Sequence, residues 1–205
     1  MVDLPKPGEI KLGHTDLRNV LENRTSIRDY SNTPLSLEEL SYLLWCTRGI
    51  KEILPNSITF RTVPSAGARH AFETYLLINR VEGIEPALYK FLDTEHKLSL
   101  FNDREHIAKD ITKACLNQRF VQESAVTFIW VAVYSKMAER YRERSYKYLH
   151  LDAGHVCQNL YLSAESIGAG VCAIAAYNDD KLNDLLELDG KERFVIYIAT
   201  AGMKK

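Results

Sequence analysis

The feature that most constrains this chain is the apolar segment 125–134, which reads AVTFIWVAVY. It is far shorter than the ~20 residues that a membrane-spanning helix needs. β-Branched and aromatic residues favour strands, and apolar side chains at successive positions place apolar groups on both faces of a strand. The segment therefore predicts a central β-strand that is buried on both faces.

The rest of the chain mixes helical and strand patterns. Ser36 and Glu39 form an S-x-x-E capping box for a helix that Gly49 is well placed to end. An apolar stripe with steps of three and four predicts a long helix over 149–167, closed by the glycines around 168–170. Further helices are expected over 15–23, with Thr15 as candidate N-cap, and over 103–118 and 179–190. Strands are expected over 73–80, 171–177 and 194–199, and a hairpin over 88–101. The prediction is one α+β domain spanning residues 1–205.

Three polar residues lie near the predicted start of the long helix, namely His150, Asp152 and His155. Asp152 is expected to interact favourably with the positive end of the helix dipole. Histidines in such a position are more often structural than catalytic, so we expect them to serve the fold.

Composition narrows the class of partner. Lys plus Arg total 26 and Asp plus Glu total 27, and this near-balance argues against a nucleic-acid or anionic-membrane partner. The N-terminal segment MVDLPKPGEIKLG has neither the basic nor the apolar region of a signal peptide, so we expect a soluble, cytoplasmic protein without a membrane segment. No cysteine belongs to a C-x-x-C pair, so the sequence predicts no metal site. We expect reduced, buried thiols at all four cysteines, which are Cys46, Cys115, Cys157 and Cys172.

Three segments suit a phosphate or a planar ring. In the first, Arg24-Thr25-Ser26-Ile27-Arg28, two guanidinium groups and two hydroxyl groups match the geometry of phosphate oxygens. The second, RTVPSAGAR over 61–69, has small residues that let the backbone approach a flat ligand. The third, VCAIAAY over 171–177, has small side chains that fit beside a ring face. The structural alternatives are a solvated helix end, an ordinary loop and simple strand packing, respectively.

Taken together, the segments resemble the nitroreductase superfamily, and in particular its SagB-type dehydrogenase branch. The resemblance runs from about residue 21 to 202 and rests on RTSIRDYSNTPLSLEELSYLLW, RTVPSAGAR, HLDAGHVCQNLYLSAESIGAG and VCAIAAYNDDKL. It implies the nitroreductase-like α+β fold, with a mixed central sheet flanked by helices. It also implies a homodimer that binds FMN at the subunit interface.

The resemblance assigns roles to particular residues. Arg24, Ser26 and Arg28 would hold the phosphate and polar edge of FMN, and Thr25 stands where many relatives carry a basic residue or histidine. The other subunit would contribute Pro64, Ser65, Ala66 and Gly67. Contacts to the ribityl chain or ring are implied for Gln118, Arg119, Ala175 and Ala176, and Lys204 or Lys205 would replace the basic C-terminal extension of relatives.

The implied activity is hydride transfer from NADH or NADPH through FMN to a small acceptor such as a nitro compound or a quinone. Two alternatives stay open. Lys147 and Tyr148 resemble the Lys-Tyr pair of dehydrogenases that oxidise peptide azolines, although the same segment is also typical of a solvated helix. A flavin-binding protein without catalytic turnover is the other alternative.

Overall fold

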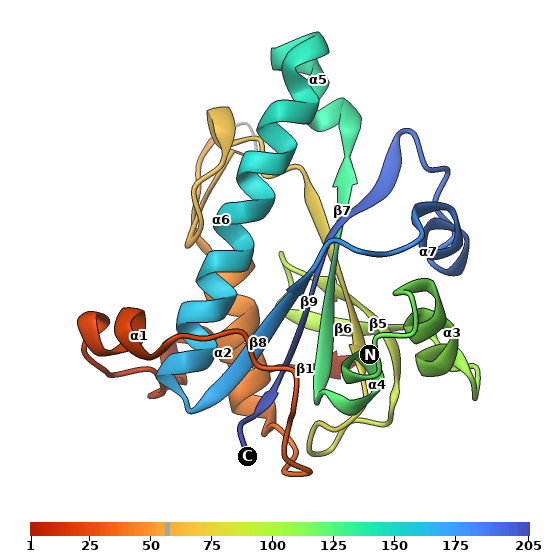
Figure 1. The fold of residues 1–205 in the computed structure, drawn as a ribbon. Helices are drawn as coiled ribbons and strands as arrows, with labels where there is room; N and C mark the ends of the chain where they lie inside the picture. Colours follow the sequence, from red (N-terminus) through yellow and green to blue (C-terminus); the bar gives the residue numbers. More distant parts are fainter. Residues whose placement is uncertain (56–57) are drawn as a thin grey trace.

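The computed structural model describes residues 1–55 and 58–205, and its centre is a seven-stranded sheet in the order β1-β6-β5-β4-β7-β9-β8 (Figure 1). The strands are β1 (Val2–Asp3), β4 (Phe72–Ile78), β5 (Ala87–Leu92), β6 (Lys97–Asn102), β7 (Val126–Val133), β8 (Ala169–Ile174) and β9 (Arg193–Met203). Neighbouring strands pair antiparallel, and parallel pairing enters through the isolated bridges Ser26–Val171 and Leu35–Val81. With helices flanking this sheet, the fold belongs to the predicted α+β class.

Helices cover both faces of the sheet, as Figure 1 shows. One layer contains α1 (Leu17–Asn23), α2 (Leu37–Arg48) and α6 (Ser145–Ser166), and the other contains α3 (Ile107–Ala114), α4 (Phe120–Glu123) and α7 (Asp179–Leu185). In β7, Phe128 and Trp130 belong to the core beneath α2 and α6, whereas Ile129 and Val131 belong to the core beneath α3 and α7. The prediction of a central strand buried on both faces is confirmed.

Helix α2 begins and ends where the sequence predicts. Ser36 accepts a hydrogen bond from the amide of Glu39 at 3.1 Å, and its own amide donates to the Glu39 carboxylate at 2.8 Å. Gly49 follows as the C-cap. The start of α1 differs, because the carboxylate of Asp16 accepts two first-turn amides and makes Asp16, rather than Thr15, the N-cap.

The long helix α6 begins before its predicted start and ends close to its predicted end. It opens at Ser145, so Asp152 lies well inside the helix. The prediction that Asp152 interacts with the helix N-terminus is therefore wrong, since the dipole effect is confined to the first turn. Gly168, which follows the last turn, has a φ of 78°, as expected for a left-handed residue after the helix.

Other predicted boundaries move for local reasons. Helix α3 is shorter than 103–118 because Leu116 and Asn117 have positive φ values, which a right-handed helix cannot continue. Helix α7 likewise stops before Glu187, which also has a positive φ. Strand β9 continues past 199 to Met203 because its last residues pair with β8.

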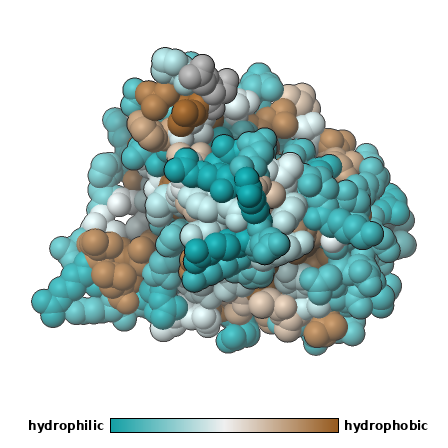
Figure 2. All heavy atoms as spheres, turned by 90° about the horizontal axis from the view of Figure 1, so that it is seen from above, coloured by the Kyte–Doolittle hydropathy of each residue, from teal (hydrophilic) through white to brown (hydrophobic). Residues whose placement is uncertain are grey.

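Two elements without a predicted counterpart extend from the body of the fold. They are the hairpin of β2 (Ile50–Ile53) and β3 (Thr59–Arg61), and the helix α5 (Tyr134–Tyr141) above the sheet (Figure 1). Figure 2 shows hydrophobic patches near the hairpin and at the far left of the molecule, where α1 lies. The exposed apolar side chains of these two places are Leu17, Leu21, Ile53, Ile58 and Phe60.

The described ranges contain no helix with the length and apolarity that crossing a membrane requires. The four cysteines are free thiols, and all except the half-buried Cys46 are buried. Burial raises the pKa of Cys115 to about 12, so its thiolate is scarce near neutral pH.

Candidate functional site

The segment 24–28 lies along β8, the strand at one edge of the sheet. Ser26 forms a parallel bridge with Val171, and the amide of Ile27 donates to the carbonyl of Val171 at 2.9 Å. Gly170 permits this approach, because a Cβ atom there would lie 2.5 Å from Cγ1 of Ile27. The structure therefore brings together the first and third of the predicted segments.

Both arginines of this segment remain available to a ligand. The guanidinium carbon of Arg24 lies 5.3 Å from the centroid of the Tyr161 ring, which is a cation–π contact. Burial raises the pKa of the Cys172 thiol, and the positive charge of the exposed Arg28 opposes that rise. Across residues 1–55 and 58–205, neither arginine forms an ion pair with a carboxylate. This edge of the sheet therefore presents positive charge to which an anion can bind.

Tyr161 of α6 joins the segment to the strand, and sequence reasoning did not identify it. Its hydroxyl group accepts a hydrogen bond from the amide of Ala173 at 2.9 Å and lies 3.0 Å from Oγ of Ser26. The one available signal was an aromatic side chain beside the apolar stripe of the long helix.

The end of β8 is continued by Ala175 and Ala176, which are both exposed. In the part of the chain that the structure describes, their backbone amides donate no hydrogen bond. Gln118 is placed beside them, because its Nε2 donates to the carbonyl of Ala176 at 2.8 Å and to that of Cys115 at 2.9 Å. Arg119 instead forms an exposed ion pair with a glutamate one helical turn later.

Residues 64–67 of the second segment lie elsewhere on the protomer, against the first half of α6. The hydroxyl of Ser65 donates to the carboxylate of Asp152 at 2.6 Å, and the amide of Ala66 donates to the same carboxylate at 3.1 Å. Burial raises the pKa of Asp152, and these two hydrogen bonds oppose that rise. Pro64 and Gly67 are exposed, and Gly67 has a φ of 57°. The fixed part of this segment therefore faces α6, while its exposed part faces outward.

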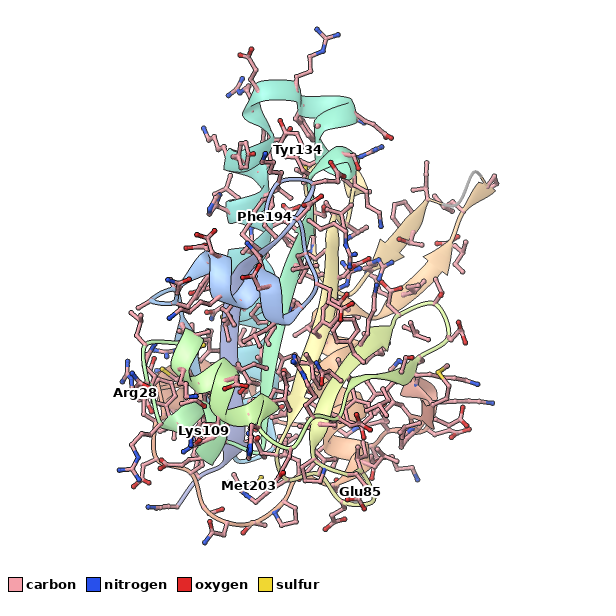
Figure 3. All side chains as sticks on the ribbon, turned by 90° about the vertical axis from the view of Figure 1, so that its right-hand side faces the viewer. Arg28, Glu85, Lys109, Tyr134, Phe194 and Met203 are labelled. Carbon is pink, nitrogen blue, oxygen red and sulfur yellow. The ribbon has the colours of Figure 1, made fainter. Side chains whose placement is uncertain are left out.

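One protomer does not bring the second segment to the first. Residues 152 and 161 are about 14 Å apart along α6 at the helical rise of 1.5 Å per residue. In Figure 3, Arg28 lies in the lower part of the molecule and Tyr134 near its top, at the start of α5, the helix whose Tyr141 lies beside Gly67. Within one protomer, the two segments therefore lie at separate positions along α6.

Lys147 and Tyr148 lie in the first turn of α6. The ring of Tyr148 packs on that of Tyr141, with centroids 4.2 Å apart, and Tyr141 of α5 in turn lies beside Gly67. Lys147 is exposed and forms no ion pair among the described residues. Tyr148 is thus connected to the second segment through Tyr141, and Lys147 is its neighbour in the helix.

The C-terminal lysines are engaged by carboxylates. Lys204 Nζ lies 2.6 Å from both carboxylate oxygens of Glu165, and Lys205 Nζ lies 2.5 Å from Oδ1 of Asp29. Lys204 also bridges to Tyr30 through the backbone, which places it near the first segment. A phosphate that bound Lys204 would have to compete with Glu165.

The geometry suits an elongated, partly anionic ligand. Arginine and serine side chains stand beside the start of the exposed edge of β8. At its end stand Ala175 and Ala176, whose amides have no acceptor within residues 1–55 and 58–205. In residues 1–55 and 58–205, no cluster of His, Cys, Asp and Glu has the form of a metal site. The site therefore offers binding and electrostatic stabilisation by arginine, hydroxyl and amide donors.

Known proteins share this sequence pattern and this fold. The model of the Nitroreductase family matches residues 21–202. A protein of Methanocaldococcus jannaschii, provisionally named a nitroreductase, is 34% identical over 187 residues, which cover 91% of this chain and 89% of that protein. The provisionally named nitroreductase of Ralstonia eutropha has a crystal structure that superposes with a TM-score of 0.80 at 24% identity, covering 100% of this chain and 89% of that one.

A further relative is named for the processing of a toxin and not as a nitroreductase. The trifolitoxin-processing protein TfxB of Rhizobium leguminosarum bv. trifolii is 28% identical over 133 residues. The match covers 63% of this chain and 36% of TfxB, so this chain corresponds to little more than a third of that relative.

Proposed function

This chain belongs to the nitroreductase family, and from that premise we propose that it is an FMN-dependent oxidoreductase that works as a homodimer. Its electron donor is NADH or NADPH, and its acceptor is a small molecule such as a nitro compound or a quinone. The observation that carries the proposal is the edge of β8, where a serine and two arginines stand beside the strand and two amides follow its end. Among the described residues, these arginines have no carboxylate partner and these amides donate no hydrogen bond.

The residues present fit the chemistry of FMN. The phosphate of FMN is an anion with several acceptor oxygens, and Arg24 and Arg28 supply charged donors without competing carboxylates among the described residues. The ring of FMN is flat with a polar edge, and Ala175 and Ala176 leave both space and free amide donors. Such orphaned exposed amides are suitable partners for ring carbonyl and nitrogen acceptors.

When bound, FMN supplies hydride transfer between the nicotinamide donor and the acceptor. The protein's own task is to bind and tune it. Arg24 and Arg28 neutralise the phosphate and fix its position. The amides of Ala175 and Ala176 donate to the polar edge of the ring and stabilise the negative charge that reduction adds there. Gln118 holds this turn in place through its hydrogen bond to Ala176.

Two observations support the homodimer. The second segment lies about 14 Å along α6 from the first and has an exposed part that faces away from that helix, so a partner protomer can present it to a flavin held at β8. The exposed apolar side chains of α1 and of the β2–β3 hairpin are also the kind of surface that an interface buries. A C2 dimer would bury both patches twice and build two equivalent sites.

The test is a titration of flavin-free protein with FMN, followed by flavin fluorescence, together with the molar mass from light scattering. The proposal expects one FMN per chain and a mass of two chains. Saturable binding by a monomer would overturn the shared site, and absence of FMN binding would overturn the proposal as a whole.

A second candidate function is oxidation of azoline rings in a peptide to azoles. Lys147 and Tyr148 favour it, because Tyr148 packs on Tyr141, which lies beside Gly67 of the second flavin segment. The likeness to a trifolitoxin-processing protein favours it too. In this reaction Lys147 or Tyr148 would remove one proton from the azoline ring and bound FMN would supply the hydride acceptor, so the peptide would lose two hydrogens in total.

Mass spectrometry distinguishes the two candidates. An azoline-containing peptide incubated with the FMN-loaded protein loses two hydrogens per ring only if the second function holds. Lys147→Ala and Tyr148→Phe would then abolish azole formation while NAD(P)H oxidation with a quinone continues.

A further inference from the structure

We propose that Tyr161 is a positioning residue for the phosphate of FMN, acting by fixing the Ser26 hydroxyl as a hydrogen-bond donor. The inference rests on the proposed function, since it names a residue that serves the same site. Tyr161 lies on α6, outside all three segments that the sequence singles out. Its contacts nevertheless reach the first segment, 24–28, here called the phosphate segment, at Arg24 and Ser26. They also reach the edge strand β8 at Ala173.

The hydrogen bonds of Tyr161 have a defined direction. A backbone amide can only donate, so the amide of Ala173 uses one lone pair of the Tyr161 oxygen at 2.9 Å. The hydroxyl hydrogen of Tyr161 is then free to point at Oγ of Ser26, 3.0 Å away. In that arrangement Ser26 accepts from Tyr161 and keeps its own hydrogen for another acceptor.

An ionised phosphate oxygen selects this arrangement. Ionised oxygens accept hydrogen bonds and cannot donate them, so Ser26 has to donate to the phosphate. Ser26 has a single hydrogen, and it therefore cannot donate to Tyr161 at the same time. The only chain of bonds that satisfies all three groups runs from the amide of Ala173 through Tyr161 and Ser26 to the phosphate.

The ring of Tyr161 serves a second partner. The guanidinium carbon of Arg24 lies 5.3 Å from the ring centroid, close enough for cation–π attraction. The ring and the hydroxyl group therefore hold two different phosphate donors, Arg24 and Ser26. Tyr161→Phe separates these effects, because it keeps the ring and removes the hydroxyl group, whereas Tyr161→Leu removes both.

The experiment compares FMN with riboflavin, which lacks the phosphate. Dissociation constants for both are measured by fluorescence titration of flavin-free wild type, Tyr161→Phe, Ser26→Ala and the double variant. We expect Tyr161→Phe to weaken FMN binding about tenfold, the effect of one charge-assisted hydrogen bond, and to leave riboflavin binding unchanged. In the Ser26→Ala background the same change should cause no further loss, since both act through one bond to the phosphate. Tyr161→Leu should weaken FMN further.

The control is Tyr89→Phe on β5, far from β8 in the sheet, which removes a tyrosine hydroxyl group that donates to the carbonyl of Glu85. It should change neither constant. Equal weakening of FMN and riboflavin by Tyr161→Phe would assign Tyr161 a general structural role and overturn the inference, as would additive losses in the double variant. If the wild type binds neither flavin, the proposed function itself fails. If it binds FMN and the variant binds equally well, only the present inference fails.

Discussion

The hydroxyl group of Ser65 donates a 2.6 Å hydrogen bond to the carboxylate of Asp152, a residue that is 3% exposed inside α6. The same carboxylate accepts from the amide of Ala66, and the Ser65 oxygen in turn accepts from the amide of His70. A single buried acid thus fixes the loop that carries the second segment. Asp152 is consequently a structural anchor for the proposed site.

Replacement of Asp152 by alanine should therefore loosen this loop. The Ser65 hydroxyl and the Ala66 amide would lose their acceptor, and the free energy of unfolding should fall by about 2–3 kcal/mol. Urea unfolding followed by circular dichroism measures the change. Asp103→Ala, at an exposed position, serves as the control and should change it little. Equal stability of the Asp152 variant and the wild type would contradict the anchoring role.

Asp93 should make stability depend on pH. It accepts from Arg48 and Arg61, both at 2.7 Å, whose side chains are 4% and 7% exposed. Burial by itself raises the pKa of Asp93, but the two guanidinium groups outweigh it and hold the pKa below its ordinary value. Arg61 ends β3 and is the first residue of the second segment, so this ion pair also fixes the start of that segment.

The direction of this pH dependence follows from the linkage between proton binding and folding. A carboxyl group with a lowered pKa stabilises the folded state above its ordinary pKa of about 4, and that contribution is lost as the pH falls through the lowered value. Asp93→Asn should cost about 3 kcal/mol at pH 7, and the difference from wild type should shrink on acidification. Asp110→Asn, in an exposed ion pair, should cost almost nothing. Unfolding at several pH values measures this, and a pH-independent difference for Asp93→Asn would refute it.

Gly170→Ala should disturb the phosphate segment. The new Cβ would lie 2.5 Å from Ile27 Cγ1, so the segment 26–28 has to move away from β8, and we expect a loss of about 1–3 kcal/mol in stability together with weaker FMN binding. Gly154→Ala in α6 is the matched control, since a Cβ there meets nothing within 4 Å. It should stabilise the protein by up to about 1 kcal/mol. Thermal unfolding of both variants measures the two changes in stability. Equal stability of Gly170→Ala and Gly154→Ala would contradict the close approach of Ile27 to β8.

Arg24→Ala and Arg28→Ala should each lower FMN affinity by about tenfold or more without unfolding the protein, because each removes a charged phosphate donor. The measure is the ratio of flavin to protein absorbance after gel filtration. Arg18→Ala, in an exposed ion pair on α1, should keep full occupancy. Unchanged occupancy in both site variants would rule out the phosphate assignment.

The parts of the fold that the sequence predicts correctly are those with strong local signals. The capping box of α2, the apolar stripe of α6 and the apolar run of β7 each follow from residues close together in the chain. The β2–β3 hairpin and α5 lacked such signals, because the hairpin has an irregular register and exposed apolar residues, and α5 has few buried ones.

The candidate site shows the same division. The phosphate segment and the alanines after β8 were predicted, and the structure joins them at one edge. Tyr161 and Asp152 gain their roles from partners 135 and 87 positions away, respectively, which local patterns do not reveal. Their contacts arise only once α6 packs between the segments.

If the proposed function holds, NADH or NADPH reduces a flavin that this chain binds. The most direct measurement is the absorption spectrum of the FMN-loaded protein before and after anaerobic addition of NADH or NADPH. We predict flavin bands that bleach on addition of one of the two donors. Bands that persist with both donors would contradict the NAD(P)H-dependent activity and favour the peptide-oxidising or flavin-carrying alternative. A colourless protein that FMN cannot load would contradict the flavin site itself.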